Sequence, residues 1–184
     1  MSVEDCHVIK VDTNEIGNGN GIRTVVWVAG CSHGVKRLED RKPGQCYGCH
    51  NPETWKWNQG HKLTQRLIDL ILDTIDKPHI DGLTVSGGDP LFVKNREGVT
   101  ELCRQFRARF GNTKSIWLWT GYVYDDVKDL DVMQYIDVLV DGPYICELKD
   151  ITLPYCGSSN QRVIRLIDGK VVGEIKDQNS PLLS

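Results

Sequence analysis

The sequence lacks the features that mark several broad classes of protein. No apolar run approaches the ~20 residues that a membrane-spanning helix requires. The N-terminal segment MSVEDCHVIK has no apolar centre of the kind found in signal peptides. A formal net charge of −3 gives no general attraction to nucleic acid or to an acidic membrane surface. We therefore expect a cytoplasmic protein with no nucleic-acid partner and no membrane partner.

Internal repeats and low-complexity segments are also absent from the sequence. A chain of 184 residues with 40% hydrophobic and 26% charged residues is typical of one soluble globular domain. We predict a single domain over residues 1–184. Residues 36–45 are charged and turn-rich, as a surface insertion would be, and residues 176–184 are expected to form a loose tail.

Cysteine is present in an odd number, seven, which argues against a disulfide framework and favours metal binding or catalysis. Cys31, Cys46 and Cys49 lie in one segment, and no fourth cysteine lies close to them in sequence. Structural zinc sites have four ligands, and a saturated iron–sulfur cube has four thiolates. Three thiolates would leave one coordination position for a ligand that is not protein.

The spacing of the cysteines is by itself compatible with several kinds of site. Cys46 and Cys49 form a C-x-x-C pair, which is found in metal sites, clusters and redox dithiols. Zinc bound by the three cysteines with His33 or His50 is chemically reasonable. The long gap between Cys31 and Cys46 adds about 1 kcal/mol of loop-closure entropy, which does not exclude Cys31 as a ligand. The other cysteines are interpreted as structural or incidental: Cys6, Cys103, Cys146 and Cys156.

The hydrophobic pattern predicts strands that alternate with helices. Strands are expected at 6–12, 23–29, 82–86, 115–120 and 136–142. Helices are expected from an N-cap at Thr64 to about Ile75, over 96–109 before Gly111, and near 125–134. RVIRLI and VVGEI flank Asp168-Gly169 and predict a C-terminal β-hairpin. The fold class is therefore α/β with a mostly parallel sheet, and it has too few βα units for a closed eight-stranded barrel.

Four segments that follow predicted strands are candidates for the functional site: the cysteine loop, Gly87-Gly88-Asp89-Pro90, Thr120-Gly121-Tyr122 and Asp141-Gly142. Because the carboxyl ends of parallel strands share one edge, we expect these segments to meet. The GGDP sequence also suits a simple tight turn. The glycines at 17, 19 and 21 lack the G-x-G-x-x-G spacing, so they do not support a dinucleotide site.

Seven stretches, in order along most of the chain, are similar to those of one family: NGNGIR (18–23), GCSH (30–33), CYGCHNPETW (46–55), LTVSGGDPL (83–91), IWLWTGY (116–122), VLVDGPY (138–144) and GSSNQRVI (157–164). Together they resemble the anaerobic ribonucleoside-triphosphate reductase activating proteins of the radical SAM superfamily. The resemblance implies a single radical SAM domain with an incomplete β/α barrel.

The cysteine spacing departs from the usual superfamily pattern, C-x3-C-x2-C. Counting from Cys31, that pattern places the second ligand at Val35, whereas an insertion moves it to Cys46. A C-x14-C-x2-C pattern is also known among 7-carboxy-7-deazaguanine synthases of the superfamily, which makes that enzyme an alternative. A zinc-stapled adaptor that binds a partner is a third, non-enzymatic hypothesis.

The resemblance implies that Cys31, Cys46 and Cys49 each hold one iron of a [4Fe–4S] cluster and that the fourth iron binds the amino and carboxylate groups of S-adenosylmethionine. The GGDP turn would hold the methionyl amine, and Gly48 would let the adenosyl part approach. The residues that the resemblance assigns to cofactor binding are Gly48, Cys49, His50, Gly87, Gly88 and Asp89.

The activity implied by the resemblance is reductive cleavage of S-adenosylmethionine to a 5′-deoxyadenosyl radical, which takes a hydrogen atom from a glycine of the large anaerobic ribonucleotide reductase subunit. An electron donor such as flavodoxin or a thioredoxin system is expected. Trp55 and Trp57 follow the cluster loop and are interpreted as an apolar lid, with a reductase-docking surface as the alternative. Arg23 and Arg162 are given no role.

Overall fold

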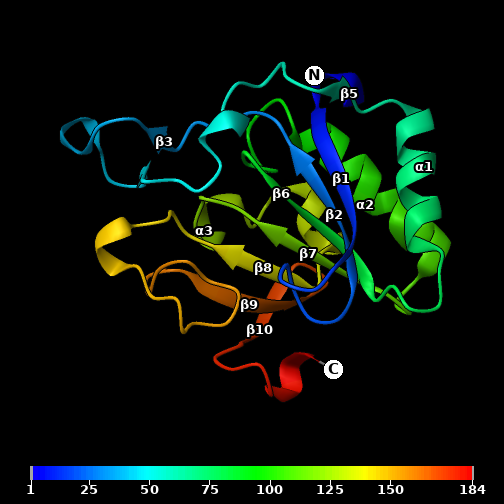
Figure 1. Ribbon diagram of the computed structural model, residues 1–184. Helices are drawn as coiled ribbons and strands as arrows, with labels where there is room; N and C mark the ends of the chain where they lie inside the picture. Colours follow the sequence, from blue (N-terminus) through cyan, green and yellow to red (C-terminus); the bar gives the residue numbers. More distant parts are fainter. Residues whose placement is uncertain (1, 184) are drawn as a thin grey trace.

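A computed structural model describes residues 2–183 of the chain. Within that range the main sheet has eight strands in the order β10-β9-β8-β7-β6-β2-β1-β5, and β3 and β4 form a small separate sheet (Figure 1). The strands are β1 (His7–Glu15), β2 (Arg23–Val28), β3 (Gly34–Val35), β4 (Cys46–Tyr47), β5 (His61–Lys62), β6 (Gly82–Gly87), β7 (Ser115–Trp119), β8 (Val138–Asp141), β9 (Arg162–Ile167) and β10 (Lys170–Glu174). The helices are α1 (Gln65–Ile75), α2 (Arg96–Phe110) and α3 (Tyr124–Val127), with 3-10 turns at Val3–Asp5, Leu38–Asp40, Pro52–Thr54, Asp131–Tyr135, Cys146–Leu148 and Pro181–Leu183.

The four central strands of the sheet, β2, β6, β7 and β8, are parallel neighbours. Their side chains are almost all buried on both faces, as expected for parallel strands linked by crossover helices. The flanking strands pair antiparallel: β1 with β2 and β5 on one side, β9 with β8 and β10 on the other. The α/β class is confirmed, and the sheet is mixed, with a parallel centre and antiparallel flanks.

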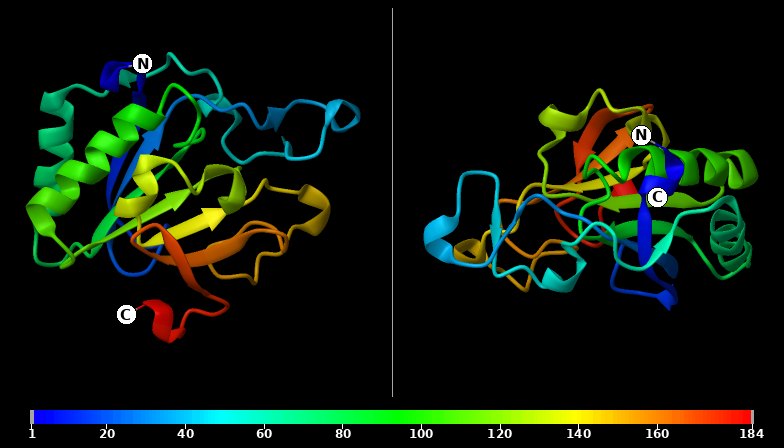
Figure 2. Two further views of the ribbon diagram at one scale, coloured as in Figure 1. Left: turned by 180° about the vertical axis from the view of Figure 1, so that it is seen from behind. Right: turned by 90° about the horizontal axis from the view of Figure 1, so that it is seen from above.

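Helices α1 and α2 lie against one face of the sheet, and Figure 2 shows α2 lying across it when the molecule is seen from behind. Thr64 caps α1 as predicted, because its Oγ1 accepts a hydrogen bond from the Leu67 amide at 3.4 Å. Helix α2 buries Leu102, Cys103 and Phe106 and ends at Gly111, whose φ is 54°. Among the described helices none is long and apolar enough to cross a membrane.

The helix predicted near 125–134 is in fact two short pieces, α3 and the 3-10 turn Asp131–Tyr135. Four aspartates lie in the sequence DDVKDLD, which runs from the first piece into the second. Aspartate favours caps and turns over helix interiors, because its carboxylate competes for backbone amides. Val127, Val132 and Met133 are nevertheless buried, so both pieces still cover the sheet.

The C-terminal hairpin of β9 and β10 forms as predicted. Asp168 and Gly169 both have positive φ, 50° and 74°, as a tight two-residue hairpin turn requires. The segment after it, which we expected to be loose, ends in a 3-10 turn whose Leu182 lies close to Gly173 and, with Leu183, packs against the apolar cluster around Trp117. Partial burial of these two side chains holds this end of the chain against the sheet. Ser184 lies outside the described residues.

Arg23, to which the sequence analysis gave no role, is a wholly buried cation at the start of β2. Its guanidinium donates hydrogen bonds to Thr84 Oγ1, to the Leu83 carbonyl and to the Ser115 carbonyl and hydroxyl. A further bond to the Asn20 carbonyl ties down the NGNGIR loop. Burial lowers the pKa of Arg23 to about 9, against the opposing charges of Asp137 and Asp81, so the group stays charged at neutral pH.

Replacement of this cation tests its structural role. Arg23→Met should lower the free energy of unfolding by about 3 kcal/mol, because several buried acceptors would lose their donors at once. Urea denaturation measures the change. Arg66→Met on the exposed face of α1 is the matched control and should have little effect. Equal stability of the two variants would contradict this role.

Candidate functional site

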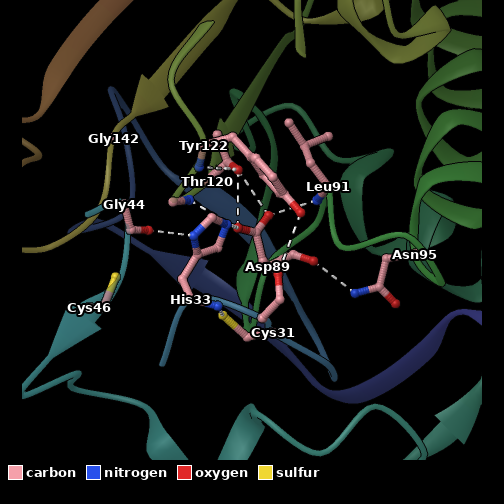
Figure 3. Close-up of polar contacts among 12 residues, drawn as sticks. Cys31, His33, Gly44, Cys46, Asp89, Leu91, Asn95, Thr120, Tyr122 and Gly142 are labelled. Carbon is pink, nitrogen blue, oxygen red and sulfur yellow. Dashed lines mark hydrogen bonds and ion pairs between the residues drawn. The ribbon is translucent and has the colours of Figure 1, made fainter. Parts of the chain in front are cut away.

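The four segments predicted to meet at the carboxyl ends of the parallel strands do so. The Asp89 amide donates to the Gly30 carbonyl at 2.8 Å, which joins the GGDP turn to the cysteine loop. Thr120 Oγ1 donates to the Asp89 carboxylate, and the Gly142 amide donates to the Tyr122 carbonyl at 2.8 Å. The close-up in Figure 3 shows Thr120, Leu91 and His33 around Asp89.

Asp89 is the centre of this network, and its side chain is only 1% exposed. Its Oδ1 accepts from the Leu91 amide at 2.8 Å and from Thr120 Oγ1 at 2.9 Å. Its Oδ2 accepts from the Gly121 amide at 3.0 Å and lies 3.2 Å from His33 Nε2. A buried carboxylate needs such donors, because an unpaired charge away from water is costly. The structure thus gives Asp89 an anchoring role, and the contact with a methionyl amine stays a prediction.

Asn95, which the sequence analysis missed, braces the same turn from the start of α2. It is fully buried, and its Nδ2 donates to the Ala29 carbonyl at 2.9 Å and to the Asp89 carbonyl at 2.8 Å. The side chain therefore ties the end of β2 to the GGDP turn. Asparagine is a common N-cap residue, and Asn95 occupies the N-cap position of α2. The sequence therefore indicated the start of a helix here and gave no sign of a role at the site.

His33 connects the cysteine loop to this centre. Its Nδ1 lies 2.9 Å from the Gly44 carbonyl and its Nε2 lies 3.2 Å from Asp89 Oδ2, without the alignment of a straight hydrogen bond. Both ring nitrogens thus face acceptors, which suits a protonated ring. Burial lowers the pKa of His33, but the neighbouring Asp89 carboxylate and the Gly44 carbonyl outweigh this effect, and the net shift of the pKa is upward. A ring engaged on both sides is a poor fourth ligand for zinc.

The three cysteine sulfurs share one feature. Each accepts a hydrogen bond from a backbone amide: Cys31 from His33 at 3.3 Å, Cys46 from Tyr144 at 3.2 Å and Cys49 from Asn51 at 3.4 Å. Amides directed at sulfur stabilise thiolates and tune the potential of bound clusters. Burial raises the pKa of the Cys31 thiol to about 12 and that of Cys46 to about 11, so a metal must displace their protons.

The described residues contain no group of three His, Cys, Asp or Glu side chains placed to hold one metal ion. The three thiols are nevertheless neighbours in one loop system, because the insertion leaves and returns at the same place. In the parallel pairing of β3 with β4, Gly34 lies beside Cys46 and Val35 beside Tyr47. Cys46 therefore lies next to the position that C-x3-C spacing would give to the second ligand.

The glycines assigned to cofactor binding differ in how tightly they are packed. A Cβ on Gly88 would lie 2.5 Å from the Gly30 carbonyl oxygen, and one on Gly87, whose φ is 115°, would lie 2.5 Å from the Val28 carbonyl oxygen. Gly48 has a φ of 73° and more room, since a Cβ there would lie 3.5 Å from the Cβ of Cys146. The tight-turn interpretation thus accounts for Gly87 and Gly88, and a binding role for all three remains a prediction.

A cavity of about 580 Å³ lies beside the last cysteine of the loop. Cys49 and His50 line it together with Trp27, Ser86 and Trp119 of the sheet. Tyr144 also lines it and packs against His50, with ring centroids 5.1 Å apart. The cavity combines aromatic walls with many polar groups, among them Asn18, Asn51 and Gln161, and it lies next to a candidate metal ligand, which suits a polar small molecule.

A second cavity, of about 570 Å³, lies elsewhere on the molecule and is lined by Asp81, Arg107, Lys114, Asp137 and Arg165, among others. None of the predicted site residues lines it. Its charges are already engaged, because Arg107 pairs with Asp137 and the Lys114 ammonium donates to the Lys77 carbonyl. We therefore place the site at the cysteine loop.

The motifs VLVDGPY and GSSNQRVI support the cysteine loop from outside. Gln161 accepts from the Gly157 amide at 3.0 Å and donates to the Gly142 carbonyl at 3.1 Å, and Ser158 Oγ accepts from the Ile145 amide at 3.2 Å. These bonds fix the segment that presents the Tyr144 amide to Cys46. Arg162, left without a role on sequence alone, forms an ion pair with buried Asp141 at the same corner.

The remaining candidates divide between core and site. Cys6 and Cys103 are buried in the core, which agrees with their interpretation as structural residues. Cys156 lines the same cavity as Cys49, and Cys146 lies beside Gly48. Trp55 lies against Gly34 of the cysteine loop, and its role as a lid stays a prediction. Trp57 is 41% exposed, with His7 and Lys94 against its ring.

Comparison with known proteins gives consistent matches. Residues 17–164 match the family described as "4Fe-4S single cluster domain". The chain is 40% identical to the anaerobic ribonucleoside-triphosphate reductase-activating protein of Enterobacteria phage T4, over 83% of this chain and 89% of that protein. It is 37% identical to the proteins of the same name from Escherichia coli K12 (83% of this chain, 94% of that protein) and Vibrio cholerae (82% and 92%). No solved structure matches significantly.

Substitution of Asp89 tests whether the buried carboxylate holds the site together. Asp89→Asn should lower the free energy of unfolding by about 3 kcal/mol, because an amide nitrogen would replace one of two oxygens that face donors. Chemical denaturation of the metal-free protein measures this. Asp69→Asn on the exposed face of α1 is the control. A loss no greater than in the control would contradict the role.

Proposed function

The chain belongs to the anaerobic ribonucleoside-triphosphate reductase-activating proteins and carries their 4Fe-4S single cluster domain, and from this premise we propose that it generates a glycyl radical on the large reductase subunit. The observation that carries the proposal is the set of three thiols, each with its own sulfur-directed amide, the last of which lines a cavity. Such a donor set fits a [4Fe–4S] cluster held by three cysteines. The reductase subunit is then a protein substrate and the partner of this site.

Cys31, Cys46 and Cys49 would hold the cluster, which when bound supplies an open iron for S-adenosylmethionine and the electron that cleaves its S–C5′ bond. The chain supplies position and exclusion of water. His33, Tyr144 and Asn51 would direct their amides at the thiolates and stabilise the negative charge on sulfur.

The cavity would hold S-adenosylmethionine at the cluster. Cys49 and His50 line its cluster side, and the indoles of Trp27 and Trp119 form part of its wall. Gly48 would leave room for the adenosyl part. The methionyl amine would meet backbone carbonyls of Gly87 and Gly88, held in place by the anchored Asp89, rather than the carboxylate itself, whose oxygens already accept from the protein.

Three further expectations form part of this proposal. The parallel centre of the sheet, β2-β6-β7-β8, would be the core of a partial β/α barrel of the radical SAM type. An external electron donor, flavodoxin or a thioredoxin system, would reduce the cluster. The reaction would take place in the cytoplasm. The long gap between Cys31 and Cys46 favours one alternative, a 7-carboxy-7-deazaguanine synthase-like enzyme.

Loss of one thiol tests the ligand assignment. After anaerobic reconstitution the wild-type protein should be brown, should absorb at about 400 nm and should hold about four iron atoms and four sulfide ions per chain. Cys46→Ala should remain folded, lose the cluster and fail to cleave S-adenosylmethionine. Cys103→Ala, a core control, should lose about 1 kcal/mol of stability and keep the cluster. Equal cluster loss in both variants would mean that the ligands are wrongly assigned.

A reaction with the protein substrate separates the two enzymatic functions. Reduced holoprotein mixed with S-adenosylmethionine and the large reductase subunit should produce the EPR doublet of a glycyl radical. Absence of the doublet, together with turnover of a carboxypterin, would favour the deazaguanine synthase-like alternative. Stoichiometric zinc without colour would exclude both and favour the zinc-stapled adaptor.

A further inference from the structure

Residue 33 contacts both of the cysteines that the insertion separates in sequence. Its amide donates to Cys31 Sγ at 3.3 Å, and its carbonyl accepts from the Cys46 amide at 2.7 Å. Fourteen residues lie between Cys31 and Cys46 in the sequence. The backbone of His33 therefore joins the two ends of a long loop, and its orientation decides where both thiols lie relative to one another.

The His33 side chain holds this backbone in place from two directions. On one side its Nδ1 lies 2.9 Å from the carbonyl of Gly44, two residues before Cys46. On the other its Nε2 lies 3.2 Å from Asp89 Oδ2. The ring is mostly buried, at 11% exposure. The two contacts connect the returning end of the insertion to the GGDP turn.

Neighbouring residues leave the ring little freedom. Tyr122 packs edge-on against it, with ring centroids 4.4 Å apart and planes at 84°. A Cβ added to Gly121 would lie 2.8 Å from His33 Cγ and Cδ2, so the absence of a side chain there makes room for the ring. The WTGY motif thus shapes a slot for this histidine.

The inserted residues themselves supply few contacts that could hold the two ends of the loop together. Most of residues 36–45 are exposed, and Arg37 pairs with Asp40 inside the insertion. Arg41 pairs with Glu147 on a partly exposed surface, where an ion pair adds little. At the base of the loop lie the contacts of His33, the half-buried pairing of β3 with β4, and the segment after β8, which bonds to Cys46 through the Tyr144 amide and pairs with Tyr47 through Ile145.

We propose that His33 is a positioning residue that holds Cys46 beside Cys31 across the insertion and ties both thiols to the Asp89 anchor. The inference rests on the proposed function for the identity of the bound cluster, but the contacts themselves belong to the metal-free chain. Removal of a residue that orients metal ligands typically costs about 10–100-fold in metal affinity. His33 would act through the cysteines and would not touch the cluster.

The first experiment measures the distance between the two thiols without a cluster. The metal-free full chain is treated with a short bifunctional thiol reagent, and the rate of Cys31–Cys46 cross-linking is followed by peptide mass spectrometry. His33→Ala should slow this cross-link about tenfold. Cys103→Ala, destabilised in the core, and His79→Ala, an exposed histidine, should leave it unchanged. An unchanged rate in His33→Ala would overturn the proposal.

Two conservative variants separate the two side-chain contacts. The amide nitrogen of His33→Asn can take the place of Nδ1 and donate to the Gly44 carbonyl, whereas that of His33→Gln can take the place of Nε2 and donate to Asp89. Asn should restore most of the cross-linking rate and Gln only part of it. Equal failure of both variants to improve on alanine would contradict positioning by these contacts.

The reconstituted protein supplies an independent measurement. Iron release to a chelator should be about tenfold faster from His33→Ala than from wild type, with His33→Asn intermediate and His79→Ala unchanged. If the wild type holds a cluster but forms no glycyl radical, the proposed function fails and the cross-linking result still decides the role of His33. If the wild type is active and His33→Ala matches it in cross-linking and iron release, the role of His33 fails alone.

Discussion

The carboxylate of Asp89 lies away from water and must find its hydrogen-bond donors within the protein. It finds them in the Leu91 amide and in the Thr120–Gly121 segment, and the ring of His33 lies 3.2 Å from it. These groups come from parts of the chain that are far apart in sequence, and one buried charge brings them to the same point. The rest of the site is built around that point: the cysteine loop through His33, and the start of α2 through Asn95.

The family's sequence motifs are connected in space, each supporting the next. GSSNQRVI holds the segment that follows β8, and Tyr144 in that segment directs its amide at Cys46. NGNGIR is held by the buried guanidinium of Arg23, which also bonds to the carbonyls of β6 and β7. Most of these motifs therefore act through backbone position. They prepare three thiols and a cavity, in agreement with a protein that leaves the difficult chemistry to a cofactor.

Several features of the fold followed from local rules. The cap at Thr64, the buried stripe of α2 and the turn at Asp168-Gly169 depend on neighbouring residues and formed as predicted. The broken helix after Tyr124 was missed, because it depends on competition between aspartate turns and a continuous helix. The packing of Leu182 was missed, because it depends on the cluster around Trp117, which is distant in sequence. Strand β5, only two residues long, left no periodic signal at all.

The three cysteines, the order of strands and helices, and the family could be predicted from the chain alone, because ligand type, periodicity and motif spacing are local properties. How the C-x14-C gap closes is visible only in the folded protein, where Gly34 lies beside Cys46 and His33 bonds to both cysteines. The fold also makes Asp89 an anchor and Arg23 a buried support. Burial and partners across long separations set these roles, since a side chain's charge must be balanced by whatever the fold places next to it.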